Sequence, residues 1–401
     1  MAGTVQYRCL LMETKRIGYI DAMRGFTMIL VVYSHVCSYC LGDRSMGFND
    51  VLFLFRLPCF FFISGWLFYK ADRQWNRLTV RQVVSRKFMV QIVPTFIFLL
   101  LLVTIHDGQS PMEFFSHLGA TKGGYWFTFA LFEFFVLYIL SALISRKRQN
   151  DVLRLCIAVV ISFSAFCFDV NYHYLTTHPS PIIHPSVITI LGFLSFITWR
   201  YYLFFFLGTL ARKHFGLFLR LTDNRPLMIA AFVGFFIVAC RLKGFFSSTI
   251  QHDSIITGYL MFAVGGVLGM IIVFTIFRRL SGTHYRLPKI RHPSKATNRN
   301  DSASPFTLTF VGRRTLDIYL LHYFFLPRFL LSYVQEFRSF NNPFLESAVA
   351  LLLALLVTAV CLLVSYVIRL SPFLGHYLFG VDYERKKLTY IKNNAGLSKK
   401  A

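Results

Sequence analysis

The sequence predicts an all-α fold, a polytopic transmembrane helix bundle of about ten spans with both termini in the cytoplasm. Three observations predict it. The 401 residues are 55% hydrophobic and only 15% charged, a balance too apolar for the surface of a water-soluble domain. The apolar residues form long runs with few charges. The basic residues behind the net charge of +24 gather in alternate loops.

Ten apolar stretches are each long enough, or nearly so, to cross the hydrocarbon core as a helix. We place them at roughly residues 19–39, 51–69, 88–106, 125–144, 153–169, 187–210, 226–241, 255–277, 315–333 and 344–370. We expect residues 1–370 to form the transmembrane domain and residues 371–401 to form a basic cytoplasmic tail. The longest polar stretches are too short and too basic to form a soluble core.

The distribution of lysine and arginine orients these spans. With the N-terminus inside, about thirty basic residues fall in cytoplasmic segments, and about four fall in outer loops. A strongly positive chain can also indicate a nucleic-acid partner, but that function needs the basic residues on one binding face. Segregation between loops argues against nucleic acid and indicates a lipid bilayer as the partner. The basic stretches 70–87 and 278–300 could also contact anionic lipid headgroups, and 70–87 has the pattern of a helix lying on the membrane surface.

No metal site is predicted. Cys37 and Cys40 form a lone C-x-x-C without histidine ligands at metal spacing, so we interpret them as packing residues or an incidental disulfide. The histidines near the outer loops match no helical metal pair either.

The first span carries the most informative polar residues. An ionisable side chain inside a span costs several kcal/mol unless it is paired or hydrated, so each one is a candidate for function. Asp21, Arg24 and His35 fall within about 60° of one another on the helix, and Arg24 and His35 are about 16 Å apart along the axis. Arg24 suits a phosphate-bearing ligand, and His35 suits proton abstraction from a hydroxyl. Alternatively, Asp21 pairs with Arg24 and His35 bonds a neighbouring helix.

Other spans carry further candidates. Arg56 precedes Pro58, where we expect a kink in the second span. Glu133 lies two turns after Trp126 in the fourth span, and its carboxylate could orient an imidazole, bind a sugar hydroxyl or pair with Arg56 or Arg200. Trp126 could equally belong to the aromatic belt at the membrane interface.

The ninth stretch contains one charged pair and one histidine. Arg313 and Asp317 are spaced for an i,i+4 pair near the cytosolic entry. His322 is a second candidate ligand or proton carrier, and structural hydrogen bonding would explain it as well.

Four segments together resemble the acyltransferase-3 family of membrane acyltransferases, which often modify envelope polysaccharides and related glycans. The order of these segments and the number of helices are similar to the family across nearly the whole chain. The segments are Tyr19–Gly25 with His35 following, Leu57–Trp66, Phe204–Gly208 and Ile318–His322.

The resemblance implies transfer of an acyl group, usually acetyl, from cytosolic acyl-CoA to a hydroxyl of a glycan or lipid-linked acceptor in the bacterial inner (plasma) membrane. His35 matches the catalytic histidine of the family, and Arg24 matches its essential arginine in the first helix. Acyl-CoA, usually acetyl-CoA, would be the co-substrate, with no metal. We take Glu133 as a second candidate catalytic residue.

The remaining candidates are expected to contact substrate. Where the family commonly has R-x-x-R, this chain has Arg86-Lys87-Phe88-Met89-Val90-Gln91, without the second arginine. Arg86 and Lys87 are therefore expected to supply equivalent phosphate contacts. The other candidate substrate-binding residues are Asp21, Arg56, Trp126, Tyr319 and His322.

The main alternative is a multi-span transporter or flippase of a glycan or other envelope precursor, with ionisable residues along its pathway. Such a protein more often shows paired broken helices in matching halves, whereas the obvious internal breaks here are Pro58 and Pro94. A structural scaffold would leave the polar face of the first span unexplained. We therefore expect an enzyme, an acyl-CoA-dependent O-acyltransferase.

Overall fold

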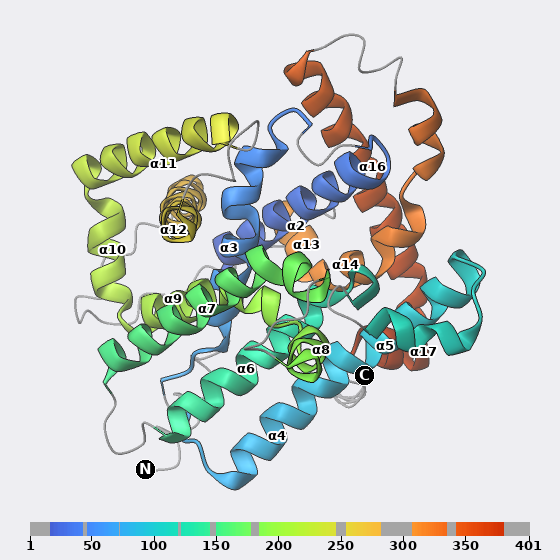
Figure 1. The fold of residues 1–401 in the computed structure, drawn as a ribbon, viewed down its shortest axis with the longest axis horizontal. Helices are drawn as coiled ribbons and strands as arrows, with labels where there is room; N and C mark the ends of the chain where they lie inside the picture. The colour runs from blue at the N-terminus through green and yellow to red at the C-terminus, as the bar shows by residue number, and fades with distance from the viewer. Residues whose placement is uncertain are drawn as a thin grey trace, which may run out of the picture.

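The computed structural model describes residues 17–42, 46–71, 73–118, 122–144, 150–177, 184–245, 254–281, 307–334 and 342–380. Helices dominate these residues, and no strand occurs among them (Figure 1). The predicted all-α fold is therefore confirmed. The end of the predicted tail, residues 381–401, lies outside the described residues.

Among the described residues, seven long helices form most of the bundle. They are α2 (Gly18–Tyr39), α3 (Asn49–Phe68), α6 (Trp126–Ile144), α7 (Asp151–Thr177), α11 (Arg225–Phe245), α12 (Ile255–Leu280) and α16 (Pro343–Ile368). The shorter helices are α8 (Pro185–Phe193), α9 (Tyr202–Lys213), α10 (Phe215–Asp223), α13 (Leu308–Arg313), α14 (Thr315–Phe325) and α17 (Pro372–Phe379). Four 3-10 segments join them, at Pro111–Leu118, Lys122–Gly124, Phe196–Tyr201 and Arg328–Tyr333.

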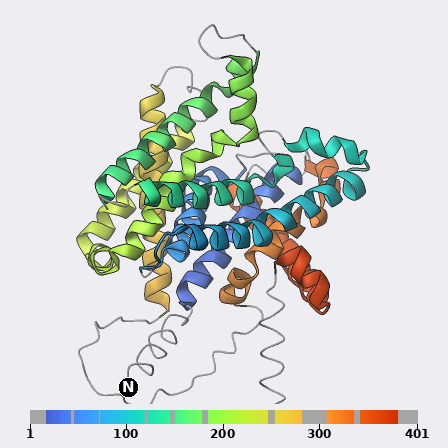
Figure 2. The ribbon, with the colours of Figure 1, turned by 90° about the horizontal axis from the view of Figure 1, so that it is seen from below.

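The stretch 70–87, predicted to form a helix on the membrane surface, is helical only from Arg77 onward, and that helix continues into the third span. Here α4 (Arg77–Lys87) and α5 (Val93–Leu101) are joined and followed by π-helical turns at Phe88–Ile92 and Leu102–His106. The side chain of Asn76 caps α4 by accepting a hydrogen bond from the Thr79 amide at 2.8 Å. This long helix runs across one side of the bundle, with α6 packed against α4 (Figure 2).

Within the described residues, seven helices are long and apolar enough to cross a membrane, and nine spans result if each of two bent pairs counts as one. The first pair is bent by 55° between Ser186–Phe193 and Phe196–Lys213. The second is bent by 78° between Phe215–Asp223 and Arg225–Arg241. All the predicted stretches except 315–333 correspond to one of these spans.

The stretch at 315–333 is not one continuous span. Helix α14 has eleven residues and is therefore about 16 Å long, roughly half the thickness of the hydrocarbon core. It ends at Phe325. The next residue, Leu326, is extended (φ −66°, ψ 123°) because the ring of Pro327 disfavours a helical residue before it. A 3-10 helix follows. The ninth stretch is thus a short helix that carries His322 into the bundle.

Helices α3 and α9 cross at a pair of glycines. A Cβ added to Gly65 would lie 1.9 Å from the carbonyl oxygen of Phe205, and one added to Gly208 would lie 2.0 Å from that of Phe62. No real Cβ atom tolerates such distances, so the two backbones touch only because both residues are glycine. Small residues allow this kind of close helix contact in membrane proteins.

A second glycine crossing joins α2 to α13. A Cβ on Gly25 would lie 2.1 Å from the carbonyl oxygen of Leu308, and one on Gly312 would lie 1.7 Å from that of Asp21. Because α14 follows α13 after a single residue, this contact also sets where α14 begins relative to α2. The two helices that carry His35 and His322 are therefore held together near one end.

Candidate active site

His35 of α2 and His322 of α14 lie side by side. Their ring centroids are 4.9 Å apart, and the ring planes are nearly perpendicular, at 83°. The side chain of His322 is fully buried. The fold thus brings together two histidines that are far apart in the sequence.

Hydrogen bonds to the backbone define where His322 carries its proton. Its Nδ1 lies 2.7 Å from the carbonyl oxygen of Tyr319 and 3.2 Å from that of Ile318. A carbonyl oxygen can only accept, so Nδ1 must be the donor. In the neutral ring Nε2 then holds a lone pair, and this atom has no hydrogen-bond partner among the residues that the structure describes. A buried imidazole nitrogen of this kind can accept a hydrogen bond from a substrate hydroxyl.

Tyrosines surround the two imidazoles. The ring of Tyr323 lies 5.0 Å from His35 and 4.2 Å from His322, measured between centroids. The ring of Tyr39 lies 5.7 Å from His35. Tyr125 packs on Tyr323 at 5.2 Å. These rings give the histidine pair an apolar, aromatic environment.

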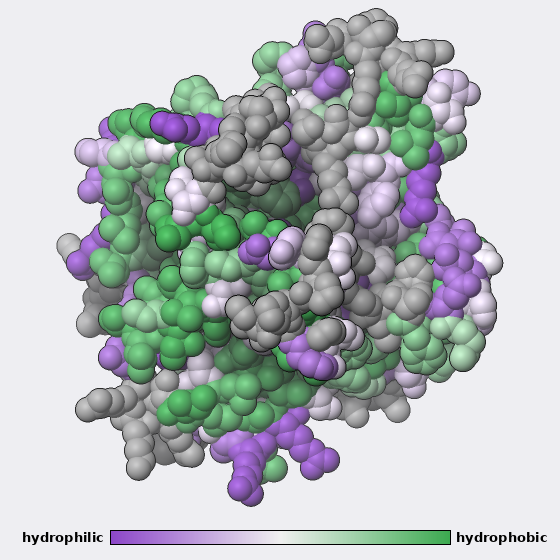
Figure 3. All heavy atoms as spheres, viewed as in Figure 1, coloured by the Kyte–Doolittle hydropathy of each residue, from purple (hydrophilic) through white to green (hydrophobic). Residues whose placement is uncertain are grey.

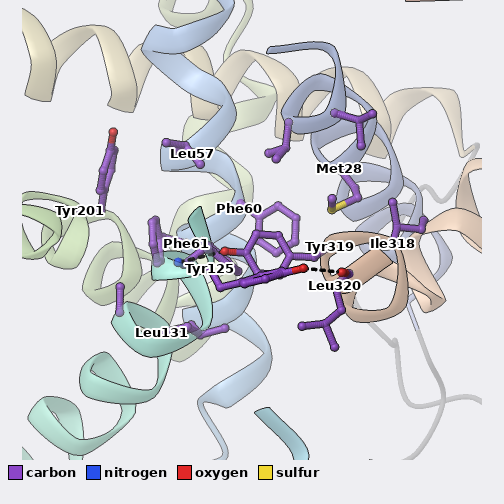
Figure 4. Packing of buried hydrophobic residues seen from close by; sticks show 14 of the residues in the cluster. Met28, Leu57, Phe60, Phe61, Tyr125, Leu131, Tyr201, Ile318, Tyr319 and Leu320 are labelled. Atoms are coloured by element: carbon purple, nitrogen blue, oxygen red, sulfur yellow. Dashed lines mark hydrogen bonds between the residues drawn. The ribbon is translucent and has the colours of Figure 1, made fainter. Parts of the chain in front are cut away.

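Two tyrosine hydroxyls tie α14 to the start of α6. Tyr125 donates a hydrogen bond to the carbonyl oxygen of Leu320 at 2.8 Å, next to the ring of Tyr319 (Figure 4). The hydroxyl of Tyr319 accepts from the amide of Phe127 at 3.1 Å and donates to the carbonyl of Gly124 at 3.2 Å. Tyr319, predicted to contact substrate, thus uses its hydroxyl to fix the helix that carries His322.

Four basic side chains meet near the other end of α2. The charge of Lys87 interacts with those of Arg24, Arg73 and Arg86, and its amino group lies 4.2 Å from the ring centroid of Phe135. The structure therefore brings together the three predicted phosphate contacts and adds Arg73. Like charges repel one another, so an anion bound among these side chains would relieve the repulsion.

Helix α2 connects this cationic cluster to the histidine pair. It is continuous from Gly18 to Tyr39, so Arg24 and His35 are separated by about 16 Å along a rigid element. The guanidinium of Arg24 is held by a hydrogen bond to the Thr315 hydroxyl at 2.7 Å. Thr315 begins α14, so α2 and α14 are in contact at both Arg24 and His35.

The aspartates make ion pairs between helices. Asp21 lies 3.5 Å from the Nε of Arg313, and Asp317 accepts two hydrogen bonds at 2.8 Å from Arg369. The local pairs that the spacing suggested, Asp21 with Arg24 and Arg313 with Asp317, are not formed among these described residues. For Arg313 the physical reason is the break at Arg314, which leaves Arg313 on α13, packed against α2. The local partner of Asp317 is instead Arg314, at 3.7 Å.

Glu133 and Trp126 lie in a neighbouring cluster. The carboxylate of Glu133 accepts a hydrogen bond from the indole of Trp199 at 2.7 Å instead of one from an imidazole. Lys122 interacts electrostatically with Glu133 from the loop before α6, and burial lowers the pKa of Lys122 because its charged form loses hydration. Trp126 stacks on Tyr201, with ring centroids 6.1 Å apart.

Arg56 lies away from the histidine pair. It is 6% exposed and donates a hydrogen bond to the side chain of Asn49 at 2.6 Å. It is within electrostatic range of Tyr33 and Cys37, which are one turn apart on α2. That face of α2 is about 160° around the helix from His35.

The four segments that resemble the family lie inside one family match. The profile of the acyltransferase domain family, acyltransferase-3, matches residues 17–369, nearly the whole chain. The chain belongs to the acyltransferase-3 family. This acyltransferase-3 protein is thus a membrane O-acyltransferase, and the transporter interpretation is no longer needed. No curated protein and no solved structure matches the chain.

The sequence patterns did not identify several residues of the candidate site. Arg73 belongs to the basic stretch before the third span, but nothing in its spacing distinguishes it from its basic neighbours. Tyr39 follows His35 by one helical turn, and Tyr323 directly follows His322, so proximity to a candidate histidine was the available signal.

Proposed function

We propose that this acyltransferase-3 protein transfers an acyl group, such as acetyl, from acyl-CoA to a hydroxyl of an envelope glycan or a lipid-linked glycan. The observation that carries the proposal is the histidine pair, in which His35 lies on the same helix as Arg24 of the cationic cluster, about 16 Å away along the axis. A transferase needs a base beside the acceptor hydroxyl and a distant anchor for its donor, and this arrangement offers both.

The donor fits the cationic cluster by its charge. Coenzyme A carries several phosphates, and Arg24, Arg73, Arg86 and Lys87 offer fork-shaped and point-like donors to them. The pantetheine arm would then extend along α2 toward His35. In the orientation predicted by the loop charges, the cluster faces the cytosol, where acyl-CoA is made.

His35 acts as the general base. As the acceptor oxygen attacks the thioester carbonyl, His35 takes the hydroxyl proton, a C–O bond forms and the C–S bond breaks. The imidazolium then returns the proton to the departing CoA thiolate, so free CoA and the acyl ester are the products. Nε2 of His322 accepts a hydrogen bond from a neighbouring hydroxyl of the acceptor, which orients the attacking one.

The acceptor requirement tests the proposal. Purified protein would be given labelled acetyl-CoA with a panel of envelope glycans and lipid-linked sugars, and both free CoA and labelled ester would be measured. We expect CoA release to need an acceptor and to match ester formation one for one. Release without any acceptor, or no ester across the panel, would contradict the proposed donor and acceptor classes.

A further inference from the structure

A groove lies on the surface of the bundle between α4 and α6, outside the site described above. Its volume is about 440 Å³. It is lined by Arg77, Val80, Arg81, Val84, Ser85 and Leu143. The acyl transfer proposed for the histidine pair makes no use of these residues.

A basic stripe on α4 borders the groove. Arg77, Arg81 and Ser85 are spaced four residues apart, so they form a single stripe along α4, and all three are exposed. Helix α4 contains no acidic residue and buries none of its side chains. This stripe presents two guanidinium groups and a hydroxyl, the donors that suit a phosphate group.

The rest of the lining is apolar and continues onto the outside of the bundle. It consists of Val80 and Val84 of α4 and Leu143 of α6. Next to them on α6, Leu140 is 49% exposed and Ile144 is 85% exposed. Figure 3 shows hydrophilic side chains at the edge of the molecule where α4 lies in Figure 1, next to a hydrophobic surface. The groove thus joins a cationic edge to a surface suited to acyl chains.

We propose that this groove binds an anionic phospholipid, with its phosphate between Arg77 and Arg81 and the upper part of an acyl chain on Val80, Val84 and Leu143. Charge complementarity selects an anionic headgroup, and each basic residue near such a surface contributes about 1 kcal/mol. A small soluble anion would leave these three apolar side chains uncovered. Because the last turn of α4 carries Arg86 and Lys87, a bound lipid would also hold that end of the helix in place.

Lipid binding by the full chain tests the inference directly. Delipidated protein in detergent would be titrated with phosphatidylglycerol and with phosphatidylcholine of identical acyl chains, and bound lipid would be counted by native mass spectrometry. We expect phosphatidylglycerol to bind more tightly, with about a fivefold loss of affinity for each arginine removed. The double variant Arg77→Gln/Arg81→Gln should lose most of the preference.

Matched variants and ligands separate this site from general charge effects. The control Arg220→Gln/Arg225→Gln removes the same charge from exposed positions on α10 and α11 and should keep the preference. Val84→Trp should block the chain and weaken binding, while glycerol phosphate, the headgroup without chains, should not displace the lipid. Equal binding of the two lipids, an unchanged preference in the groove variant, or displacement by glycerol phosphate would each overturn the proposal.

Discussion

At the scale of single residues, the candidate site offers two kinds of cation, the guanidinium of Arg24 and the ammonium of Lys87. Arg24 is held by the hydroxyl of Thr315, while Lys87 lies against the ring of Phe135. Neither of these two interactions involves an acidic group. A planar guanidinium can bind a phosphate through two parallel hydrogen bonds, whereas an ammonium acts as a point charge.

Arg24→Lys tests the proposed role of that geometry. The variant keeps the charge but loses the bidentate contact. If one charge-assisted hydrogen bond is lost, we predict that the KM for acyl-CoA rises by roughly tenfold while kcat is largely retained. Saturation curves for acetyl-CoA measure it. Arg220→Lys, an equivalent change at an exposed position, should behave like the unmodified protein. An unchanged KM in Arg24→Lys would rule out the phosphate contact.

His322→Ala tests the second imidazole. We predict a loss of about tenfold in kcat/KM for the acceptor, because one neutral hydrogen bond to substrate is removed while the base remains. The KM for acyl-CoA should stay the same, since His322 is distant from the cationic cluster. Activity is expressed per folded molecule, measured by size-exclusion chromatography in detergent. A variant with normal acceptor kinetics would make His322 purely structural.

Residue types and spacing identified part of this site. Arg24 and His35 share a face by helical geometry alone, and Arg86 and Lys87 belong to an evident basic stretch. Pairings between distant segments were not accessible in the same way. The contact of His35 with His322 depends on how α13 packs on α2, and the partner of Glu133 depends on the bend before Phe196–Tyr201.

At the scale of elements, the glycine crossings control how closely helices approach. Hydropathy located nearly every long helix, because a span must be apolar over its whole length. Hydropathy could not show that α14 is short, because the apolar run continues through Leu326, Pro327 and the residues after them. A proline late in a hydrophobic stretch was the signal for that break.

Gly208→Ala tests the crossing of α3 and α9. A methyl group there would meet the Phe62 carbonyl, so the helices must separate, and we predict a destabilisation of about 1–3 kcal/mol. Thermal unfolding in detergent measures it. Gly216→Ala is the control, because nothing lies within 4 Å of its added Cβ, and helix propensity favours alanine by about 1 kcal/mol. Equal stability of the two variants would contradict the close crossing.

At the scale of the whole molecule, loop charges predict the orientation in the membrane. Reporter fusions at Arg148 and Arg291 should be cytoplasmic, and fusions at Gly108 and Asn341 should be outside, because basic loops remain on the cytoplasmic face. Of these positions, only Gly108 is among the described residues. A cytoplasmic reporter at Gly108 would require a different assignment of the spans around it.

The central claim is that the whole protein transfers an acyl group with His35 as its base. A sugar hydroxyl has too high a pKa to attack a thioester at neutral pH unassisted, and a general base typically contributes about 10²–10⁴ in rate. The most direct measurement is ester formation per folded molecule by purified protein and by its His35→Ala variant, at saturating acetyl-CoA and acceptor. We predict that the variant binds acyl-CoA normally and is slower by about 10²–10⁴-fold. Near-normal turnover in folded His35→Ala molecules would contradict the account.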